Sequence, residues 1–469
     1  MYAPPKGRRV SPADLVAGTA DPVPAAVARA HAVLDELRIW YRFARNSKAM
    51  SCRDAAARRD RLGRVGIPIW DELKSLALTD GPHLVFAHCR GDESMDLEAV
   101  ARVAGTGPLT LADDGRLAAL GLGYGLVNPF VAPADAEATS LLQVFDHGLT
   151  VPIDVPGTIM TNAGDRTWGV EVHGEELAAA TPGAIVGAIA SPDPDPEAEP
   201  RPPAIGRRFK IGIVTGNAPE SGMVLWELIN GHVRQQLGRN NVGDVSMPPV
   251  EIQSVPAMGL SMELDLRLDP VRRAVVDATT ALVEHGCTHV AVACNTTQYF
   301  GVELEAICAA GGSQFLSMPE AVARWLQARG IQRVGMVGIR YVSDLGEWSA
   351  YRDALAPFTV ESLSERGMSR ITDIGYQVKS EGPSKGALGR LHNVLRDEFQ
   401  SHTIVLALTE LSLLLDLQTG KGRPDAKLIV DPLHVYAEAI ACAYTGAAFA
   451  AAEAGFAPAV TTVSAAIEG

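Results

Sequence analysis

The chain has 469 residues, of which 47% are hydrophobic and 20% charged, as is usual for a soluble globular protein. This length predicts two or three domains, because one hydrophobic core seldom serves more than roughly 250–300 residues. The formal net charge of −14 argues against a broadly basic surface for nucleic acid. No apolar run reaches about 18 residues and the N-terminus has no apolar signal core, so neither a membrane span nor a signal peptide is expected.

The cysteines show neither a C-x-x-C pair nor a Cys/His zinc spacing. We therefore expect no metal site and no disulfide framework, but free thiols in a reducing cytoplasm. Most of them should be inert buried side chains. The six are Cys52, Cys89, Cys287, Cys294, Cys308 and Cys442.

The N-terminal half is predicted to be an α+β unit. Residues 1–37 are expected to form a helical extension, and a helical pattern fills 23–61. An α+β domain is assigned to 38–188, with shorter segments such as HLVFAHC, LLQVFDHGL and TWGVEVHGEEL. The proline-rich and charged stretch 189–208 cannot build a core and is predicted to be an extended linker.

The C-terminal half, 209–469, alternates strands with helices, which is typical of parallel α/β sheets. Strands are predicted in KIGIVTG, THVAVAC, RVGMVGI and TIVLALTEL. Helices are predicted over 222–237, 269–286, 319–329, 345–356 and 384–399. The recurrence predicts two similar lobes, about 209–315 and 316–430, followed by a C-terminal helix over 431–455.

Cys294 ends one predicted strand and precedes Asn295 and Thr296. Ligands of parallel α/β folds bind at the carboxyl ends of strands. There the amides at a helix start favour a thiolate and can hold a substrate carboxylate. Such a thiol suits a base acting on carbon or a nucleophile, whereas a buried and unreactive cysteine is the structural alternative.

The C-terminal half resembles the cofactor-independent aspartate/glutamate racemase superfamily. The matching pieces, in order, are IGIVTGNAPESG, VAVACNTTQYF, LALTELSLLL and VDPLHVYAEAI. The resemblance implies an amino acid or a derivative as substrate, no cofactor, and often a homodimer. It also implies two cysteines that face the α-carbon from opposite sides and exchange its proton.

Four places depart from the superfamily pattern. Leu408 stands where the second cysteine belongs, Gln298 replaces a histidine, and Met258 replaces a carboxylate-binding arginine. The fourth is the threonine-rich loop after the first strand of the second lobe, which reads GIRYVSD here. Because leucine carries no exchangeable proton, the two-thiol mechanism is not available. We therefore predict a single-thiol enzyme based on Cys294. The reaction could be a one-base epimerisation, an isomerisation or a decarboxylation with stereospecific protonation, or Cys294 could attack a carbonyl as a nucleophile.

The resemblance also implies the remaining site residues. Lys379 matches a carboxylate-binding lysine, and Arg340 is a candidate replacement for the lost positive charge. For His434, a structural histidine with satisfied partners is the alternative. The implied catalytic residues are Cys294, Thr409 and Glu410, and the implied substrate-binding residues are Asn217, Ser221, Asn295, Thr296, Lys379, Arg340 and His434.

Residues 38–185 resemble the YbaK/prolyl-tRNA editing family of aminoacyl-tRNA deacylases. The matching pieces include KSLALTD, LTLADDGRLAALGLGYGLVNPF and TNAGDRTWGVEVHGEEL. The resemblance places Lys74 in the editing pocket, and Gly125 and Pro129 in a turn against the aminoacyl ester. Deacylation, or binding of an aminoacyl group without hydrolysis, is the implied activity.

Three functions remain open from the sequence. The first is an isomerase that transfers a proton at the α-carbon of a free or tRNA-linked amino acid. The second is an aminoacyl-tRNA or aminoacyl-ester hydrolase, or an acyl-transfer enzyme, with Cys294 as the nucleophile. The third is a binding module without catalysis. Aminoacyl-tRNA is a candidate partner in the first two.

Overall fold

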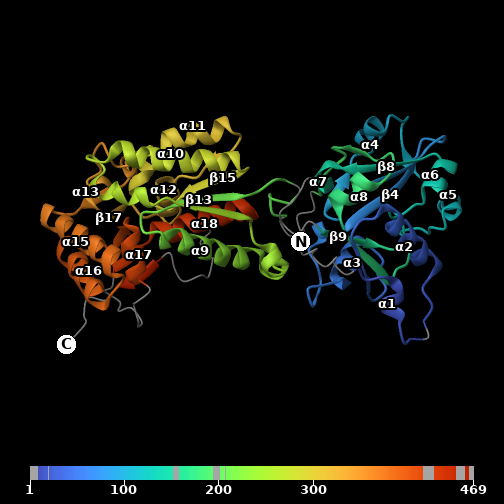
Figure 1. Cartoon of the computed structure of the whole chain (residues 1–469), viewed down its shortest axis with the longest axis horizontal. Helices are drawn as coiled ribbons and strands as arrows, with labels where there is room; N and C mark the ends of the chain where they lie inside the picture. Colours follow the sequence, from blue (N-terminus) through green and yellow to red (C-terminus); the bar gives the residue numbers. More distant parts are fainter. Residues whose placement is uncertain are drawn as a thin grey trace, which may run out of the picture. The chain divides into compact units, whose positions relative to one another are not determined.

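The computed structural model describes residues 9–19, 21–150, 158–193, 201–205, 207–415, 427–449 and 460–463. The chain forms two compact units (Figure 1). The first unit runs to Arg208 and includes Leu237–Ser246, and the second holds Phe209–Gln236 and Met247–Gly469. The predicted fold class, an α+β part followed by parallel α/β lobes, is confirmed by the sheet topology.

The first unit is built on a five-stranded mixed sheet, ordered β11-β8-β5-β4-β7, and a three-stranded antiparallel sheet, β1-β10-β9. Its strands are β1 (Tyr41–Arg45), β2 (Asp60–Arg61), β3 (Arg64–Val65), β4 (Leu73–Thr79), β5 (Leu84–Arg90), β6 (Glu93–Met95), β7 (Thr110–Leu111), β8 (Leu141–Asp146), β9 (Thr158–Asn162), β10 (Trp168–His173), β11 (Ile185–Gly187) and β12 (Ala190–Pro192). Its helices are α1 (Pro12–Val16), α2 (Ala25–Leu37), α3 (Cys52–Arg58), α4 (Leu97–Ala104), α5 (Asp114–Ala119), α6 (Pro133–Ala138), α7 (His147–Thr150) and α8 (Gly174–Ala180).

The helical pattern predicted over 23–61 is interrupted by a strand. Helix α2 ends at Leu37, and β1 follows because Tyr41 and Phe43 alternate into the core, where they pack with Val27 and Leu34 of α2. Helix α2 is therefore part of the core of the first unit rather than an appended extension.

The second unit contains two sheets of the same topology. Strands β14-β13-β15-β16 are parallel, and β18-β17-β19-β20 are parallel in the same order, with β21 added antiparallel to β20. The strands are β13 (Ile211–Thr215), β14 (Val250–Ser254), β15 (His289–Val292), β16 (Gln314–Phe315), β17 (Arg333–Val337), β18 (Thr359–Ser362), β19 (Thr403–Leu406), β20 (Lys427–Val430) and β21 (Val460–Val463). This match pairs β13 with β17 and β15 with β19.

Helices cover the sheets of the second unit. Figure 1 shows α10 on one side of β13 and α9 on the other. Helix α10 turns Val271, Val275 and Leu282 inward, a spacing typical of an amphipathic helix. The helices are α9 (Glu220–Leu237), α10 (Leu268–Glu284), α11 (Gly301–Ala310), α12 (Met318–Ala328), α13 (Arg340–Ser343), α14 (Tyr351–Ala354), α15 (Glu365–Glu381), α16 (Lys385–Glu398), α17 (Thr409–Leu415) and α18 (Pro432–Thr445), with 3-10 turns η4 (Pro256–Glu263) and η5 (Thr296–Phe300).

Two predicted helices are shorter in the structure. The helix predicted near 345–356 is reduced to α14, because Leu345 adopts a left-handed φ of 52° just before Gly346. The helix predicted over 431–455 ends at Thr445, since Gly446 caps it at a φ of 76°. Residues 450–455 of that prediction lie outside the described residues.

The predicted linker 189–208 is partly packed. Strand β12 pairs with β6, and Arg201 lies 2.6 Å from the carboxylate of Glu93. Residues 194–200 and 206 of the linker lie outside the described residues. Among the helices of the described ranges, none combines the length and the hydropathy needed to cross a bilayer.

Candidate functional site

The first lobe of the second unit places a polar pair beyond the ends of two adjacent parallel strands. Strand β15 ends at Val292 and β13 at Thr215, and Cys294 and Asn217 each follow two residues later. The amide Nδ2 of Asn217 donates a hydrogen bond to Sγ of Cys294 over 3.2 Å. Both side chains are buried, Cys294 completely. The thiol is thus held by an amide donor at the edge of the sheet where α/β folds bind ligands.

The loop that carries Asn217 has an unusual backbone. Gly216 has a φ of 141°, and a Cβ there would lie 2.0 Å from the carbonyl oxygen of Val255, so only glycine fits. Ala218 adopts a left-handed φ of 57°, which costs an alanine about 1–2 kcal/mol. The Ser221 hydroxyl lies 2.8 Å from the carbonyl oxygen of Ala218 and 3.0 Å from that of Ala293. Ser221 was predicted to bind substrate. In the structure its hydroxyl stabilises the loop through these two contacts.

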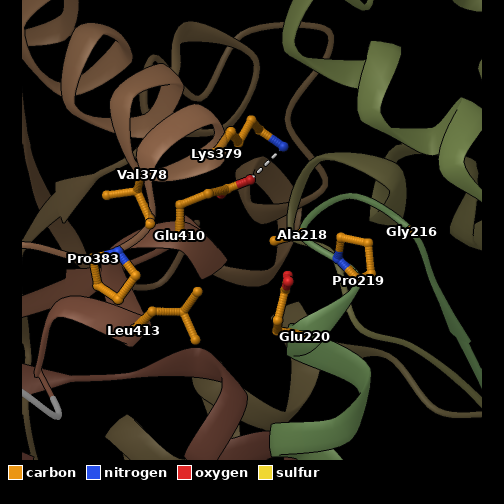
Figure 2. A pocket seen from close by; sticks show the side chains of 10 residues that line it. Gly216, Ala218, Pro219, Glu220, Val378, Lys379, Pro383, Glu410 and Leu413 are labelled. Carbon is orange, nitrogen blue, oxygen red and sulfur yellow. Dashed lines mark ion pairs between the residues drawn. The ribbon is translucent and has the colours of Figure 1, made fainter.

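The second lobe contributes an ion pair that reaches the same amide. Nζ of Lys379, on α15, lies 2.6 Å from Oε1 of Glu410, on α17 (Figure 2). The same ammonium donates to Oδ1 of Asn217. One continuous polar chain therefore joins the two lobes, and it consists of Cys294, Asn217, Lys379 and Glu410.

A pocket of about 390 Å³ opens beside this ion pair. In Figure 2, the carboxylate of Glu220 points from the start of α9 toward Glu410. The floor is fully buried Glu410, whereas Glu220 is exposed at the rim. Cys294 does not line the pocket. Asn217 and Lys379 lie between the thiol and this space in the chain of hydrogen bonds.

The matching positions of the second lobe are apolar. Strands β17 and β19 end at Val337 and Leu406, and the residues two positions later are Ile339 and Leu408, each 2% exposed. A Cβ on Gly375 of α15 would lie 3.1 Å from Leu408 Cδ2, so the helix packs closely on this side chain. The two lobes share a topology but present opposite chemistry, with a thiol and an amide on one side and two hydrocarbons on the other.

Asn295 is held by a residue that the sequence analysis missed. The hydroxyl of Tyr351, on α14, donates to Oδ1 of Asn295 over 2.6 Å. Burial, followed by the nearby carboxylate of Asp431, raises the pKa of Tyr351 well above its usual range. Tyr351 therefore stays a donor and fixes the orientation of the Asn295 amide. No pattern in WSAYRDAL distinguishes this tyrosine, because its partner is distant in sequence.

We expect Tyr351→Phe to destabilise the second unit by about 1–3 kcal/mol, because the buried Asn295 oxygen loses its donor. Urea unfolding at neutral pH measures the change. Tyr376→Phe is the matched control, since Tyr376 is 44% exposed on α15 and should change stability by less than about 0.5 kcal/mol. Equal unfolding curves for Tyr351→Phe and the wild type would contradict the assigned role.

The other residues predicted for this site have varied placements. Thr409 Oγ1 lies 3.4 Å from Oε2 of Glu410, and Thr296 is buried at the start of η5. Arg340 has a side chain that is 56% exposed and pairs with Asp265, so it does not join the polar chain. His434 Nε2 lies 4.0 Å from Asp431, near His232 of α9, where burial and then the charge of His434 lower the pKa of His232 to about 4.

Gln298 and Met258, which the resemblance places where a histidine and an arginine were expected, have structural roles. Gln298 donates from Nε2 to the carbonyl oxygen of Val292 over 2.9 Å and accepts from the Met318 amide over 3.2 Å, so it ties η5 to the sheet. Met258 is fully buried in η4. Throughout the described ranges, no three His, Cys, Asp or Glu side chains are grouped as a metal site requires.

In the first unit, the predicted pocket residues are engaged within the fold. Lys74, on β4, donates to the backbone carbonyl of Glu93. Gly125 adopts a φ of 72°, and the carbonyl of the adjacent Tyr124 accepts from Arg166 over 3.1 Å. The Pro129 carbonyl accepts from Gln143 over 3.1 Å. The turn is rigidly anchored, which is what close approach to a ligand would need, but it lies on a different element from Lys74.

His88 makes the first unit sensitive to acid. Its Nδ1 lies 2.8 Å from the Ser75 hydroxyl and its Nε2 3.2 Å from Gln143 Oε1. Burial lowers the pKa of His88 to about 4, from about 6.5 in an unfolded chain. The unfolded chain therefore binds a proton first as the pH falls.

We expect the contribution of His88 to stability to be complete above pH 6.5 and to be lost as the pH falls toward 4, by about 3 kcal/mol in total. Urea unfolding of the full chain at pH 7 and pH 4.5 measures the slope. His88→Gln, which can keep both hydrogen bonds, should flatten it. An unchanged slope in that variant would contradict the assignment.

No protein-family description and no curated protein matches this chain. Solved structures do resemble it. One, described as a candidate Asp/Glu racemase from Yersinia pestis, is 21% identical; 50% of this chain covers 98% of it, with a TM-score of 0.41. An aspartate racemase from Picrophilus torridus is 17% identical; 50% of this chain covers 93% of it, with a TM-score of 0.38.

A different segment of the chain resembles a structure described as a candidate trans-editing enzyme for prolyl tRNA synthetase. That structure is 20% identical; 36% of this chain covers 99% of it, with a TM-score of 0.30. Both segments named from the sequence thus have solved structures that resemble them. At these identities the likeness concerns the fold alone.

Proposed function

We propose that the second unit transfers a proton at the α-carbon of an amino acid, or of an activated amino acid such as an aminoacyl-tRNA, without a cofactor and with Cys294 as its single thiol. The observation that carries the proposal is the asymmetry of the two matched lobes. Cys294 and Asn217 stand on one side, and Ile339 and Leu408 on the other. Only one face of a substrate held between the lobes would meet a proton acceptor.

The chemistry follows from this arrangement. The Cys294 thiolate takes the α-proton: the Cα–H bond breaks, an S–H bond forms, and the electron pair delocalises into the neighbouring carboxyl or ester group. The thiol then returns a proton to the same face, so the configuration is retained. Asn217 and Lys379 are donors that can stabilise negative charge on sulfur and on the carboxyl oxygens.

Access to the thiol requires a change of partners. Lys379 now donates to Asn217 Oδ1 and pairs with Glu410. A substrate carboxylate can replace Asn217 as the acceptor of this ammonium, which would free the amide and open the way from the pocket to Cys294. This exchange conserves the number of hydrogen bonds of the ammonium.

The test is proton NMR in D2O with a panel of L- and D-amino acids and with aminoacyl-tRNA. The expected result is loss of the α-proton signal for one enantiomer, with its configuration retained on chiral chromatography. Exchange at both faces at equal rates would contradict the single-thiol mechanism. No exchange with any compound would overturn the proposal.

One observation favours a second function. Met258 is buried and apolar, so Lys379, which also pairs with Glu410, is the one ammonium among the described residues of the pocket that a free carboxylate could use. An ester needs no such cation. Cys294 would attack its carbonyl carbon, forming a C–S bond as the alcohol leaves, and water would release the amino acid. In the same incubation, Cys294-dependent release of an amino acid without α-deuterium would identify this reaction.

A further inference from the structure

We infer that the pocket beside Lys379 and Glu410 selects amino acids with a cationic side chain, such as lysine or ornithine, over those with an acidic one. This inference rests on the proposed function and adds a substrate class to it. It concerns the charge and the shape of the space between Glu220 and Glu410 (Figure 2).

The charges that line the pocket leave one negative charge in excess. Lys379 lies 2.6 Å from Glu410, so these two charges largely compensate each other. Glu220 remains, with its carboxylate directed toward the pocket from the rim. A second ammonium in this space would lie near both carboxylates, whereas an added carboxylate would be repelled by Glu220.

The walls suit the stem of a lysine side chain. Between the charged groups the pocket is lined by Pro219, Val378, Pro383 and Leu413, all apolar. A chain of methylene groups can lie along such walls while the charged end reaches Glu220 at the rim. The volume of about 390 Å³ accommodates a side chain of this length.

The same geometry accounts for the loss of a cation at position 258. Met258 is fully buried, and the one ammonium that lines the pocket is already paired with Glu410. An acidic side chain would therefore find no second ammonium among the described residues that line the pocket, and Glu220 would repel it. A cationic side chain leaves Lys379 and Glu410 together and gains Glu220.

The experiment compares lysine with norleucine, which has a stem of similar length without the ammonium. Isothermal calorimetry measures binding of both to the full chain, and NMR in D2O measures their α-proton exchange. We expect lysine to bind about 3- to 10-fold more tightly than norleucine at low salt, with a smaller difference at high salt. Aspartate and glutamate should bind more weakly than asparagine and glutamine.

The variants place this preference on Glu220. Glu220→Gln should bring lysine to the level of norleucine, and Glu220→Lys should favour glutamate over lysine. Glu227→Gln is the matched control, because Glu227 is exposed on the same helix and does not line the pocket. This control should change the binding of neither lysine nor norleucine.

Equal binding of lysine and norleucine by the wild type, or equal effects of Glu220→Gln and Glu227→Gln, would overturn the inference. The two proposals fail separately. A lysine preference in calorimetry without exchange of any α-proton would refute the proton-transfer reaction and leave the selectivity of the pocket standing. Exchange of α-protons without a preference for lysine over norleucine would refute the selectivity of the pocket and leave the proton-transfer reaction standing.

Discussion

Cys294→Ser is expected to lower α-proton exchange by about 10³-fold, the scale of a lost general base. Serine keeps the size of the side chain and can still accept the hydrogen bond from Asn217, which donates to Sγ over 3.2 Å in the wild type. Its hydroxyl is not appreciably ionised near neutral pH, so it cannot act as the thiolate does. The measurement is the initial rate of α-deuterium incorporation at saturating substrate.

The matched control is Cys442→Ser. Cys442 is also buried in the second unit, and it accepts a hydrogen bond from Gln236 over 3.3 Å, which serine can keep. Burial raises the pKa of Cys442 to about 11, so this thiol is not ionised near neutral pH. Its replacement should leave exchange unchanged. Full activity in Cys294→Ser, or an equal loss in both variants, would contradict the assignment of Cys294 as the base.

Leu408→Cys is expected to allow proton transfer at the second face of the substrate α-carbon. Leu408 follows β19 at the position that matches Cys294 after β15, so a thiol there would reach the α-carbon from the opposite side. We expect exchange of the disfavoured enantiomer to rise by about 10²-fold or more, and racemisation to appear, because a second acid–base group is worth about that much. Chiral chromatography of the products in D2O measures both effects.

The control is Leu408→Ala, which removes a similar volume without adding a thiol. Both variants leave a cavity beside Gly375, and we expect a loss of about 1–4 kcal/mol in the free energy of unfolding. Only Leu408→Cys should racemise. Racemisation by Leu408→Ala would show that space rather than a proton donor limits the second face. A folded Leu408→Cys variant without second-face exchange would contradict the equivalence of the two positions.

Several features of the site could be predicted from local sequence. The place of Cys294 after a buried strand follows from the β-branched run before it, and the apolar residue Leu408 after the matching strand is visible in ALTE. The same local signals predicted α10 and α16 closely. Helix periodicity and strand burial depend on neighbours a few residues apart, so the sequence alone reveals them.

Local sequence patterns predicted three elements of the second unit poorly. The Ala-rich stretch after Asp431 suggested a helix to 455, but Gly446 adopts a left-handed conformation and ends it. Strand β21 was not predicted, since its partner β20 determines whether those residues extend a sheet. The helix predicted near 345–356 is shortened because Leu345 adopts a left-handed φ, which no residue pattern indicated.

The sequence by itself determined the α/β alternation and the places of Cys294 and Leu408 after their strands, because each is a property of one segment. Only the tertiary structure decided which side chains meet. Lys379 and Asn217 are 162 positions apart and bond because α15 packs toward the loop after β13, while Arg340 is drawn to Asp265 instead. Tyr351 reaches Asn295 across 56 positions. Such contacts depend on how whole elements pack, and packing is a joint property of distant segments that no single stretch encodes.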